Sequence, residues 1–298
     1  MGILIKCAGS TFAPKYVIDT VEIPDVECEH EYDNACDAEC NLCGATRAVT
    51  HDYVDGYCTI CGKKDPNKVW TIAEYPVKAG LKGLYDLGGT AEDSLVNHAP
   101  EPHVNTAAEK IDGTYVVKDD YITFSGATNS TRFHTYLRLP AENAITYVSL
   151  FRVPSGARVL IGNRTGSDAS WASGVNLRND AVEYGENGTH VIKTFPAING
   201  DNFAVLAMTA EVDGLRVVRY TDGMLNELYT SDGAIDGWGG GPTGNAVAIA
   251  GYGKSSAANA DADIALTAIH EGVLTDEQLT EICQFVKTYG EQKGLIIE

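Results

Sequence analysis

The sequence contains no apolar run long enough to cross a membrane, and it has few basic residues. Its start, MGILIKCAGSTF, lacks the basic region and long apolar region of a secretory signal, so we expect folding in a reducing cytoplasm. Lys and Arg number 22 against 41 Asp and Glu, for a net charge of −19 in 298 residues. Nucleic acids and anionic membrane surfaces are bound through clustered cationic side chains. The composition therefore predicts a protein with neither nucleic acid nor membrane as a partner.

The cysteines gather in one stretch. Of the eight in the chain, six lie within residues 28–62, together with two histidines. Two Cys-x-x-Cys-Gly segments each place two thiolates on a tight turn that can hold one tetrahedral ion, and the glycine suits a positive φ. We therefore predict a zinc-binding module over 28–62. Its candidate ligands are Cys28, His30, Cys36, Cys40, Cys43, His51, Cys58 and Cys61.

The pairing of these ligands is left open by the sequence. Each Cys-x-x-Cys-Gly segment follows a His-x-Tyr, which makes a short repeat in two copies. The repeat favours one ion on His30, Cys36, Cys40 and Cys43, and a second on Cys28, His51, Cys58 and Cys61. In a zinc ribbon, one ion would instead take all four Cys-x-x-Cys cysteines. Disulfides are the alternative chemistry, but they need an oxidising compartment. A closed four-ligand site has no open position, so the ion would fold the module and catalyse nothing.

The chain divides into four parts. Residues 1–27 read as two short strands without a core of their own, which either join a larger sheet or anchor the chain on another protein. The zinc module at 28–62 is followed by a polar linker at 63–77. Within that linker, residues 69–72 read as a first strand of the next domain or a bridge to it. Residues 78–298 form the large domain.

The large domain is rich in short β runs separated by turn signals, which predicts a mostly β, antiparallel two-sheet sandwich. Asp213-Gly214 and Asp222-Gly223 are typical hairpin turns. One helix is predicted near the C-terminus, because Thr275 followed by Gln278 forms a capping box before an apolar helical stripe. Cys283 lies in that stripe and is expected to be a core thiol. About a dozen strands are predicted, for example at 115–117, 121–124, 144–150, 158–161, 203–208 and 215–220.

Three segments of residues 78–298 resemble the concanavalin A-like sandwich domains, in their laminin G-like branch. GLKGLYDLGG at 80–89, with EDS at 92–94, is similar to the first strand of the family and its following turn. The segment 215–229 is similar to its paired strands around Asp-Gly, and LTDEQL at 274–279 is similar to the end of its last strand and the helix after it. The resemblance implies a jelly roll of two curved sheets that often binds glycans, sometimes with calcium.

The opening residues MGILIKCAGSTFAPKYV are similar to the starts of structural proteins of bacteriophages that infect gut bacteria. The Cys/His repeat resembles repeats in surface proteins of gut anaerobes and their phages. These resemblances imply a virion protein, a fibre or decoration protein of the head or tail, assembled in the host cytoplasm. They also imply that residues 1–27 contact other virion proteins and that the chain forms a homo-oligomer, with a trimer typical of fibres.

No catalytic pattern stands out in the sequence, so we predict that the protein is not an enzyme. Glycosidases of this fold use two carboxylates, usually arranged on one strand as Glu-x-Asp-x-Glu. The histidines at 98, 103, 134, 190 and 270 are scattered and are expected at turns or on the surface. The carboxylate pairs that fall short of the glycosidase pattern are Glu183/Glu186, Glu211/Asp213 and Asp261/Asp263.

Trp171 and Trp238 are the candidate ligand-binding residues. Both lie in polar or glycine-rich segments, where an exposed aromatic ring can stack on a sugar. The alternative is that they plug the ends of the sandwich. Calcium at Asp86 and Asp93 agrees with the resemblance, although the sequence offers no complete oxygen cage.

Together these features favour a virion fibre or decoration protein whose non-catalytic sandwich binds host-surface or mucus glycans. The alternatives are a purely architectural subunit without a ligand, a bacterial surface adhesin and a glycoside hydrolase.

Overall fold

The structure is a computed structural model that describes residues 30–54, 56–63, 65, 67–100, 108–126, 131–138, 144–163, 174–186, 189–232, 246–251 and 260–298. The chain separates into two compact units, Met1–Lys68 and Val69–Glu298. The strands and the anchor predicted within 1–27 lie outside the described residues. Among the helices that are described, none has the length and apolar character needed to cross a membrane.

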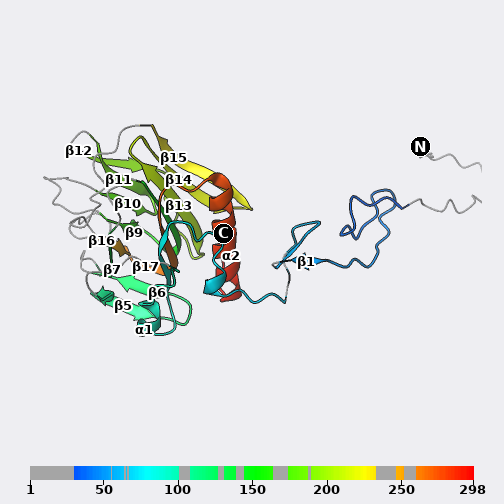
Figure 1. The fold of residues 1–298 in the computed structure, drawn as a ribbon, viewed down its shortest axis with the longest axis horizontal. Helices are drawn as coiled ribbons and strands as arrows, with labels where there is room; N and C mark the ends of the chain where they lie inside the picture. The colour runs from blue at the N-terminus through cyan, green and yellow to red at the C-terminus, as the bar shows by residue number, and fades with distance from the viewer. Residues whose placement is uncertain are drawn as a thin grey trace, which may run out of the picture. The chain divides into compact units, whose positions relative to one another are not determined.

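The second unit is a sandwich of two antiparallel sheets with one long helix near the C-terminus (Figure 1). This confirms the predicted mostly β, antiparallel two-sheet fold. The first sheet has the spatial order β12 (Thr189–Thr194), β11 (Ala181–Glu186), β10 (Val175–Arg178), β9 (Val159–Gly162), β16 (Ala246–Ile249), β7 (Arg132–Arg138) and β4 (Lys110–Asp112).

The second sheet has the order β15 (Met224–Ser231), β14 (Gly214–Thr221), β13 (Ala204–Glu211), β8 (Ala144–Arg152), β17 (Ala262–Glu271), β6 (Ile122–Ser125) and β5 (Thr114–Val117), and β3 (Leu81–Asp86) also pairs with β17. The remaining elements are β1 (Tyr53–Val54) and β2 (Tyr57–Cys58) in the first unit, and η1 (Ile72–Glu74), α1 (Ala91–Ser94) and α2 (Asp276–Gln292) in the second.

Burial explains why some strands read as apolar runs and others alternate. β8 and β17 are buried along nearly their whole length, because one face joins the core between the sheets and the other lies on the side covered by α2 (Figure 1). Strands buried on both faces lack alternation. β7 alternates strictly between buried and half-buried residues, because only one of its faces packs into the core. The residues of this core come from both sheets.

The helix α2 begins at the predicted capping box. The Thr275 hydroxyl accepts from the N–H of Gln278 at 3.3 Å, and the Thr275 N–H donates to the Gln278 side chain at 3.0 Å. Cys283 is fully buried, as predicted. A Cβ on Gly290 would lie 2.6 Å from Leu150, so the absence of a side chain lets the helix approach β8 closely.

Two local predictions need correction. Asp222 and Gly223 both have positive φ and form the tight β14–β15 turn, as predicted, but the β13–β14 turn uses Val212 and Asp213, and Gly214 already begins β14. Residues 69–72 do not form a strand. The Trp70 N–H donates to Gln292 of α2 at 2.7 Å, and the amide of Gln292 donates back to the Trp70 carbonyl at 2.9 Å. A side chain, rather than a neighbouring strand, satisfies this backbone.

Arg158 connects three segments of the backbone at one end of the sandwich through hydrogen bonds. Its guanidinium is buried and donates to three backbone carbonyls, those of Ala250 at 2.7 Å, Ala260 at 3.0 Å and Thr131 at 3.0 Å. Burial lowers the pKa of this group below its ordinary value. The three carbonyls precede or follow β16, β17 and β7, so one side chain satisfies the ends of three strands.

Candidate functional site

The two Cys-x-x-Cys-Gly segments adopt the same local structure. In each, the glycine has a positive φ, 71° at Gly44 and 69° at Gly62. Its N–H donates at 2.9 Å to the carbonyl of the first cysteine, Cys40 or Cys58. The His-x-Tyr segments also match, because the two rings lie 6.2 Å apart in the first copy, at His30 and Tyr32, and 5.6 Å apart in the second, at His51 and Tyr53. The repeat seen in the sequence is therefore a repeat in structure.

The predicted ligands in the described part of the chain form two groups. Cys36, His51, Cys58 and Cys61 make the first, and the ligand atoms within it all lie within 4.8 Å of one another. His30, Cys40 and Cys43 make the second, under the same limit. Cys28 lies outside the described residues. Seven of the eight predicted ligands are thus brought together in the two clusters.

This grouping departs from both predicted pairings. The repeat-based pairing placed Cys36 with His30, whereas its sulfur lies 3.4 Å from the sulfur of Cys58. The two Cys-x-x-Cys pairs belong to different groups, so the ribbon pairing does not hold either.

The loop at 33–39 is the reason. The Cys36 N–H donates to the Asn34 side chain at 2.8 Å, which makes a tight turn. Arg47 holds the loop by donating to the carbonyls of Asn34 and Asp37, and its guanidinium stacks 3.7 Å from the ring centre of Tyr32. Cys36 is therefore positioned by the loop at 33–39, which only the first copy of the repeat contains.

The four-residue group fits a tetrahedral zinc ion. Zn–S and Zn–N bonds of about 2.3 and 2.0 Å give ligand–ligand edges of roughly 3.3–3.8 Å. The Cys36–Cys58 and Cys61–His51 contacts are both 3.4 Å. Backbone N–H groups of Cys61 and Ile60 lower the pKa of Cys58 to about 6, whereas burial and the neighbouring Cys58 and Cys61 raise the pKa of Cys36 to about 12. A cation at the centre of the group would stabilise both thiolates. These donors make the cluster compatible with zinc.

The first unit has almost no apolar core. Among its described residues, the only buried hydrophobic side chains are those of Cys40 and Cys58. A segment this short, without buried aliphatic or aromatic side chains, needs another source of stability. Cys40 and Cys58 each belong to one of the two Cys/His groups. These two groups therefore take the place that an apolar core has in other small domains.

Asp86 and Asp93 are committed to other contacts. Asp86 accepts from the Tyr289 hydroxyl and from the Lys293 ammonium of the α2 end, both at 2.7 Å. Asp93 accepts from Thr90 at the start of α1, at 2.7 Å. Neither carboxylate belongs to a group that converges on one point in the described part of the chain. This geometry gives the calcium prediction no support.

The histidines fall into different environments. His98 is exposed, as expected, whereas His103 lies outside the described residues. His134 is half-buried, 2.9 Å from an oxygen of Asp112, and burial lowers its pKa. His190 is also half-buried. His270 was expected at a turn or on the surface, but it is fully buried between the Tyr75 hydroxyl and the Ala79 carbonyl.

Two of the six carboxylates considered for catalysis, Glu183 and Asp263, are held by cations. Glu183 is buried on the face of the first sheet opposite the core, where it accepts from Arg178 at 2.8 Å and from Asn176 at 3.3 Å. Asp263 accepts from Arg152 at 2.8 Å and from Thr123 at 2.6 Å. That the protein is not an enzyme stays a prediction.

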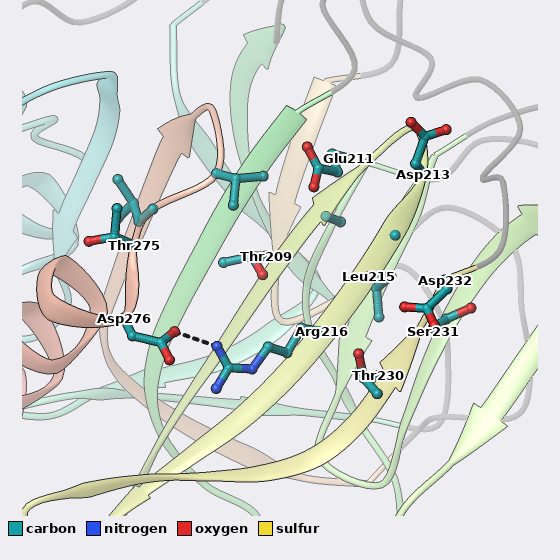
Figure 2. A pocket seen from close by; sticks show the side chains of 14 residues that line it. Thr209, Glu211, Asp213, Leu215, Arg216, Thr230, Ser231, Asp232, Thr275 and Asp276 are labelled. Atoms are coloured by element: carbon teal, nitrogen blue, oxygen red, sulfur yellow. Dashed lines mark hydrogen bonds and ion pairs between the residues drawn. The ribbon is translucent and has the colours of Figure 1, made fainter.

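Trp171 and Trp238 lie outside the described residues, so their predicted role is untested. A different feature was missed by sequence reasoning. A pocket of about 360 Å³ lies where α2 begins beside the β13–β14–β15 end of the second sheet (Figure 2). Its lining is mainly polar, and it includes the Glu211 and Asp213 carboxylates that the sequence had marked only as an incomplete catalytic pattern.

The sequence matches no protein-family model and no curated protein. Solved structures with a similar course of the chain include the receptor binding domain of botulinum neurotoxin C/D mosaic serotype, at 11% identity and a TM-score of 0.45, with 70% of this chain and 52% of that chain covered. The binding domain of botulinum neurotoxin serotype D is 10% identical at a TM-score of 0.46, with 71% and 52% covered. Trypanosoma rangeli sialidase is 11% identical at a TM-score of 0.45, with 72% and 33% covered.

The chain therefore spans about half the length of the two toxin domains and about a third of the sialidase. At such low identities and TM-scores, these likenesses carry no argument about ligands or reactions. The function has to be argued from the residues of this chain.

Proposed function

We propose that this chain is a virion structural protein of the fibre or decoration type, in which a zinc-ordered module carries a non-catalytic, glycan-binding sandwich. Residues 1–27 would hold the chain on the particle by contacts with other virion proteins, in a homo-oligomer. The zinc module would space the sandwich from this anchor. The sandwich would contact glycans of the host surface or of mucus.

The four-ligand Cys/His group is the observation that carries the zinc-ordered module in this proposal. Cys36, His51, Cys58 and Cys61 supply four ligand atoms, which would fill a tetrahedral ion and leave no position for water or substrate. An ion held in this way supplies folding energy and no chemistry. It suits a short module with almost no apolar core. In this proposal Cys28 would supply the fourth ligand for the group of His30, Cys40 and Cys43, and the module would then take two ions.

The ion pairs of the sandwich support the non-catalytic part of the proposal. A catalytic carboxyl group has to reach the bond that it acts on. Glu183 and Asp263 are buried and accept hydrogen bonds from Arg178 and Arg152, so neither carboxylate is presented to a substrate. Each is also tied to a neighbouring side chain that fixes its orientation. These groups act as structural acceptors.

The module is tested by elemental analysis of the full chain, purified without chelator. We expect two zinc ions per chain and no disulfide among the eight cysteines. Metal-free protein with crosslinked sulfurs would refute the zinc module.

The site on the particle is tested separately, with an antibody raised against residues 78–298. Signal in density-purified particles is expected, whereas signal confined to the bacterial envelope would identify a surface adhesin instead. Locating residues 1–27 in an intact assembly then tests the anchor.

Glycan binding is tested with the full chain on an array of neutral, amino and acidic glycans. Binding is expected, and its complete absence at high protein concentration would favour the purely architectural subunit. Trp171→Ala and Trp238→Ala test whether the two tryptophans carry the ligand. Release of free sugar from any bound glycan would overturn the non-catalytic assignment.

A further inference from the structure

We infer that the pocket at the start of α2 is a saccharide site that takes a neutral or amino sugar and rejects acidic ones. This inference rests on the proposed glycan-binding function and specifies its location and ligand class. The pocket lies on the α2 side of the second sheet, next to the N-terminal end of the helix (Figure 2). Its volume of about 360 Å³ is at the lower end of the range of small-molecule sites, roughly 300–1,000 Å³.

Strand register places a polar row across the floor of the pocket. Thr209 on β13 lies directly opposite Arg216 on β14, and Arg216 lies opposite Thr230 on β15. Side chains of directly paired residues share one face of a sheet. The three side chains therefore face the same side, the one on which α2 packs. The helix begins only at Asp276, at the edge of this row (Figure 2).

Thr209 lines the pocket on the floor of the sheet. The residue as a whole is only 8% exposed, so its position is fixed by the packing around it. A hydroxyl can both donate and accept, so it suits the hydroxyl groups of a sugar.

Arg216 is already held in place. Its Nε donates to Glu227 at 3.1 Å, and its Nη1 forms an ion pair with Asp276 of α2 (Figure 2). Its other terminal nitrogen, Nη2, has no partner among the described residues. A side chain fixed by two carboxylates loses little rotamer freedom when it binds a ligand. Arg216 thus presents one free donor beside the Thr209 hydroxyl.

The charge of the pocket selects the ligand class. Its lining has the carboxylates of Glu211, Asp213, Asp232 and Asp276 against the single guanidinium of Arg216. Uncompensated carboxylates repel carboxylate- or sulfate-bearing sugars and accept hydrogen bonds from hydroxyl or ammonium groups. The exposed apolar side chain of Val273, also in the lining, can contact the C–H face of a sugar ring.

A single cation fits this pocket less well. In the described part of the chain, the only groups with three or more ligand atoms within 4.8 Å of one another are the two Cys/His groups. The carboxylates of the pocket therefore do not converge on one point, as the ligands of calcium must. Spread acceptors match a ligand that carries several donors, which is the arrangement of hydroxyl groups around a sugar ring.

The experiment compares the full chain with Thr209→Val and Asp232→Asn on an array of galactose-, glucose- and N-acetylglucosamine-terminated glycans, chitosan oligosaccharides, and sialylated or glucuronate-bearing glycans. Thr209→Val removes one hydroxyl at almost constant shape, so the fold should hold. Asp232 is exposed at the rim of the pocket, so its change cannot disturb the core.

We expect the wild type to bind neutral or amino glycans only, and either variant to lower that affinity about fivefold or more. Thr194→Val, an exposed site on β12 of the other sheet, is the matched control and should bind like the wild type.

The outcomes separate the two proposals. If the wild type binds no glycan at all, the proposed function fails. If it binds and both pocket variants retain full affinity, while Trp171→Ala or Trp238→Ala abolishes binding, the function stands and the pocket inference is overturned. Preference for sialylated or glucuronate-bearing glycans would also overturn it, because that preference contradicts the charge argument.

Discussion

The buried His270 should make the stability of the sandwich depend on pH. His270 is fully buried, and its Nδ1–H donates to the Ala79 carbonyl at 3.1 Å, which leaves Nε2 to accept from the Tyr75 hydroxyl at 2.9 Å. Burial lowers the pKa of His270 from 6.5 to about 4. The folded state therefore requires the neutral imidazole, whereas the unfolded chain takes up a proton near pH 6.5. The contribution of His270 is complete above that pH and is lost as the pH falls toward 4.

The size of the effect follows from the shift. Each pKa unit corresponds to about 1.4 kcal/mol, so His270 alone should remove about 3 kcal/mol of unfolding free energy between pH 7 and pH 4, and about 2 kcal/mol by pH 5. The assay is urea unfolding followed by tryptophan fluorescence, at several pH values, for the wild type and His270→Gln. Glutamine offers one donor and one acceptor but does not titrate in this range.

The difference in unfolding free energy between these two proteins isolates His270, because the metal module and all other groups contribute to both. We expect this difference to shift by about 2 kcal/mol in favour of the variant between pH 7 and pH 5. The matched control is His98→Gln, at an exposed position, which should change stability by less than about 0.5 kcal/mol. A difference between wild type and His270→Gln that stays constant over this range would refute the reasoning.

Three further predictions follow from particular contacts. Cys36→Ser should lower the zinc content by one ion per chain, whereas the buried Cys283→Ser should leave it unchanged; elemental analysis decides, and equal zinc content in both would contradict the observed grouping. Arg158→Lys should cost about 3 kcal/mol in urea unfolding, because one ammonium cannot reach three separated carbonyls; a loss below about 1 kcal/mol would show that water replaces these bonds. Asp86→Ala should cost about 2 kcal/mol, since it leaves the buried Tyr289 hydroxyl and the half-buried Lys293 ammonium without this acceptor. Millimolar calcium should not raise the melting temperature of the wild type, and a calcium-dependent rise would restore the calcium prediction.

Local patterns predicted the elements of the sandwich well. The capping box at Thr275 and the Asp222-Gly223 turn were readable because each depends on residues within a few positions. β14 was readable because buried and half-buried residues largely alternate along it, and β8 because a mainly apolar run between turn signals is typical of a strand buried on both faces.

Apart from the β13–β14 turn, the failures in the sandwich concern long-range contacts. His270 has no local signal of burial, because its partner Tyr75 lies 195 residues away in the chain. The segment around Trp70 looked like a strand because of its apolar composition, but its backbone is satisfied by the side chain of Gln292, 222 residues away. The floor of the pocket was not predictable either, since it appears only once the register of β13, β14 and β15 is known.

The metal module shows the same limit in its ligands, with a consequence for how it folds. Residue types and spacing indicated which side chains gather in the two groups, but the position of Cys36 depends on a loop that only one copy of the repeat contains. Because Cys36 joins His51 and the second Cys-x-x-Cys pair, it lies in sequence between ligands of the other group, after His30 and before Cys40. The chain between Cys36 and Cys58 therefore carries the first Cys-x-x-Cys pair within the loop that the four-ligand group closes. Neither half can be cut out as a contiguous finger, so a tandem repeat in sequence forms one interleaved metal-binding unit in space.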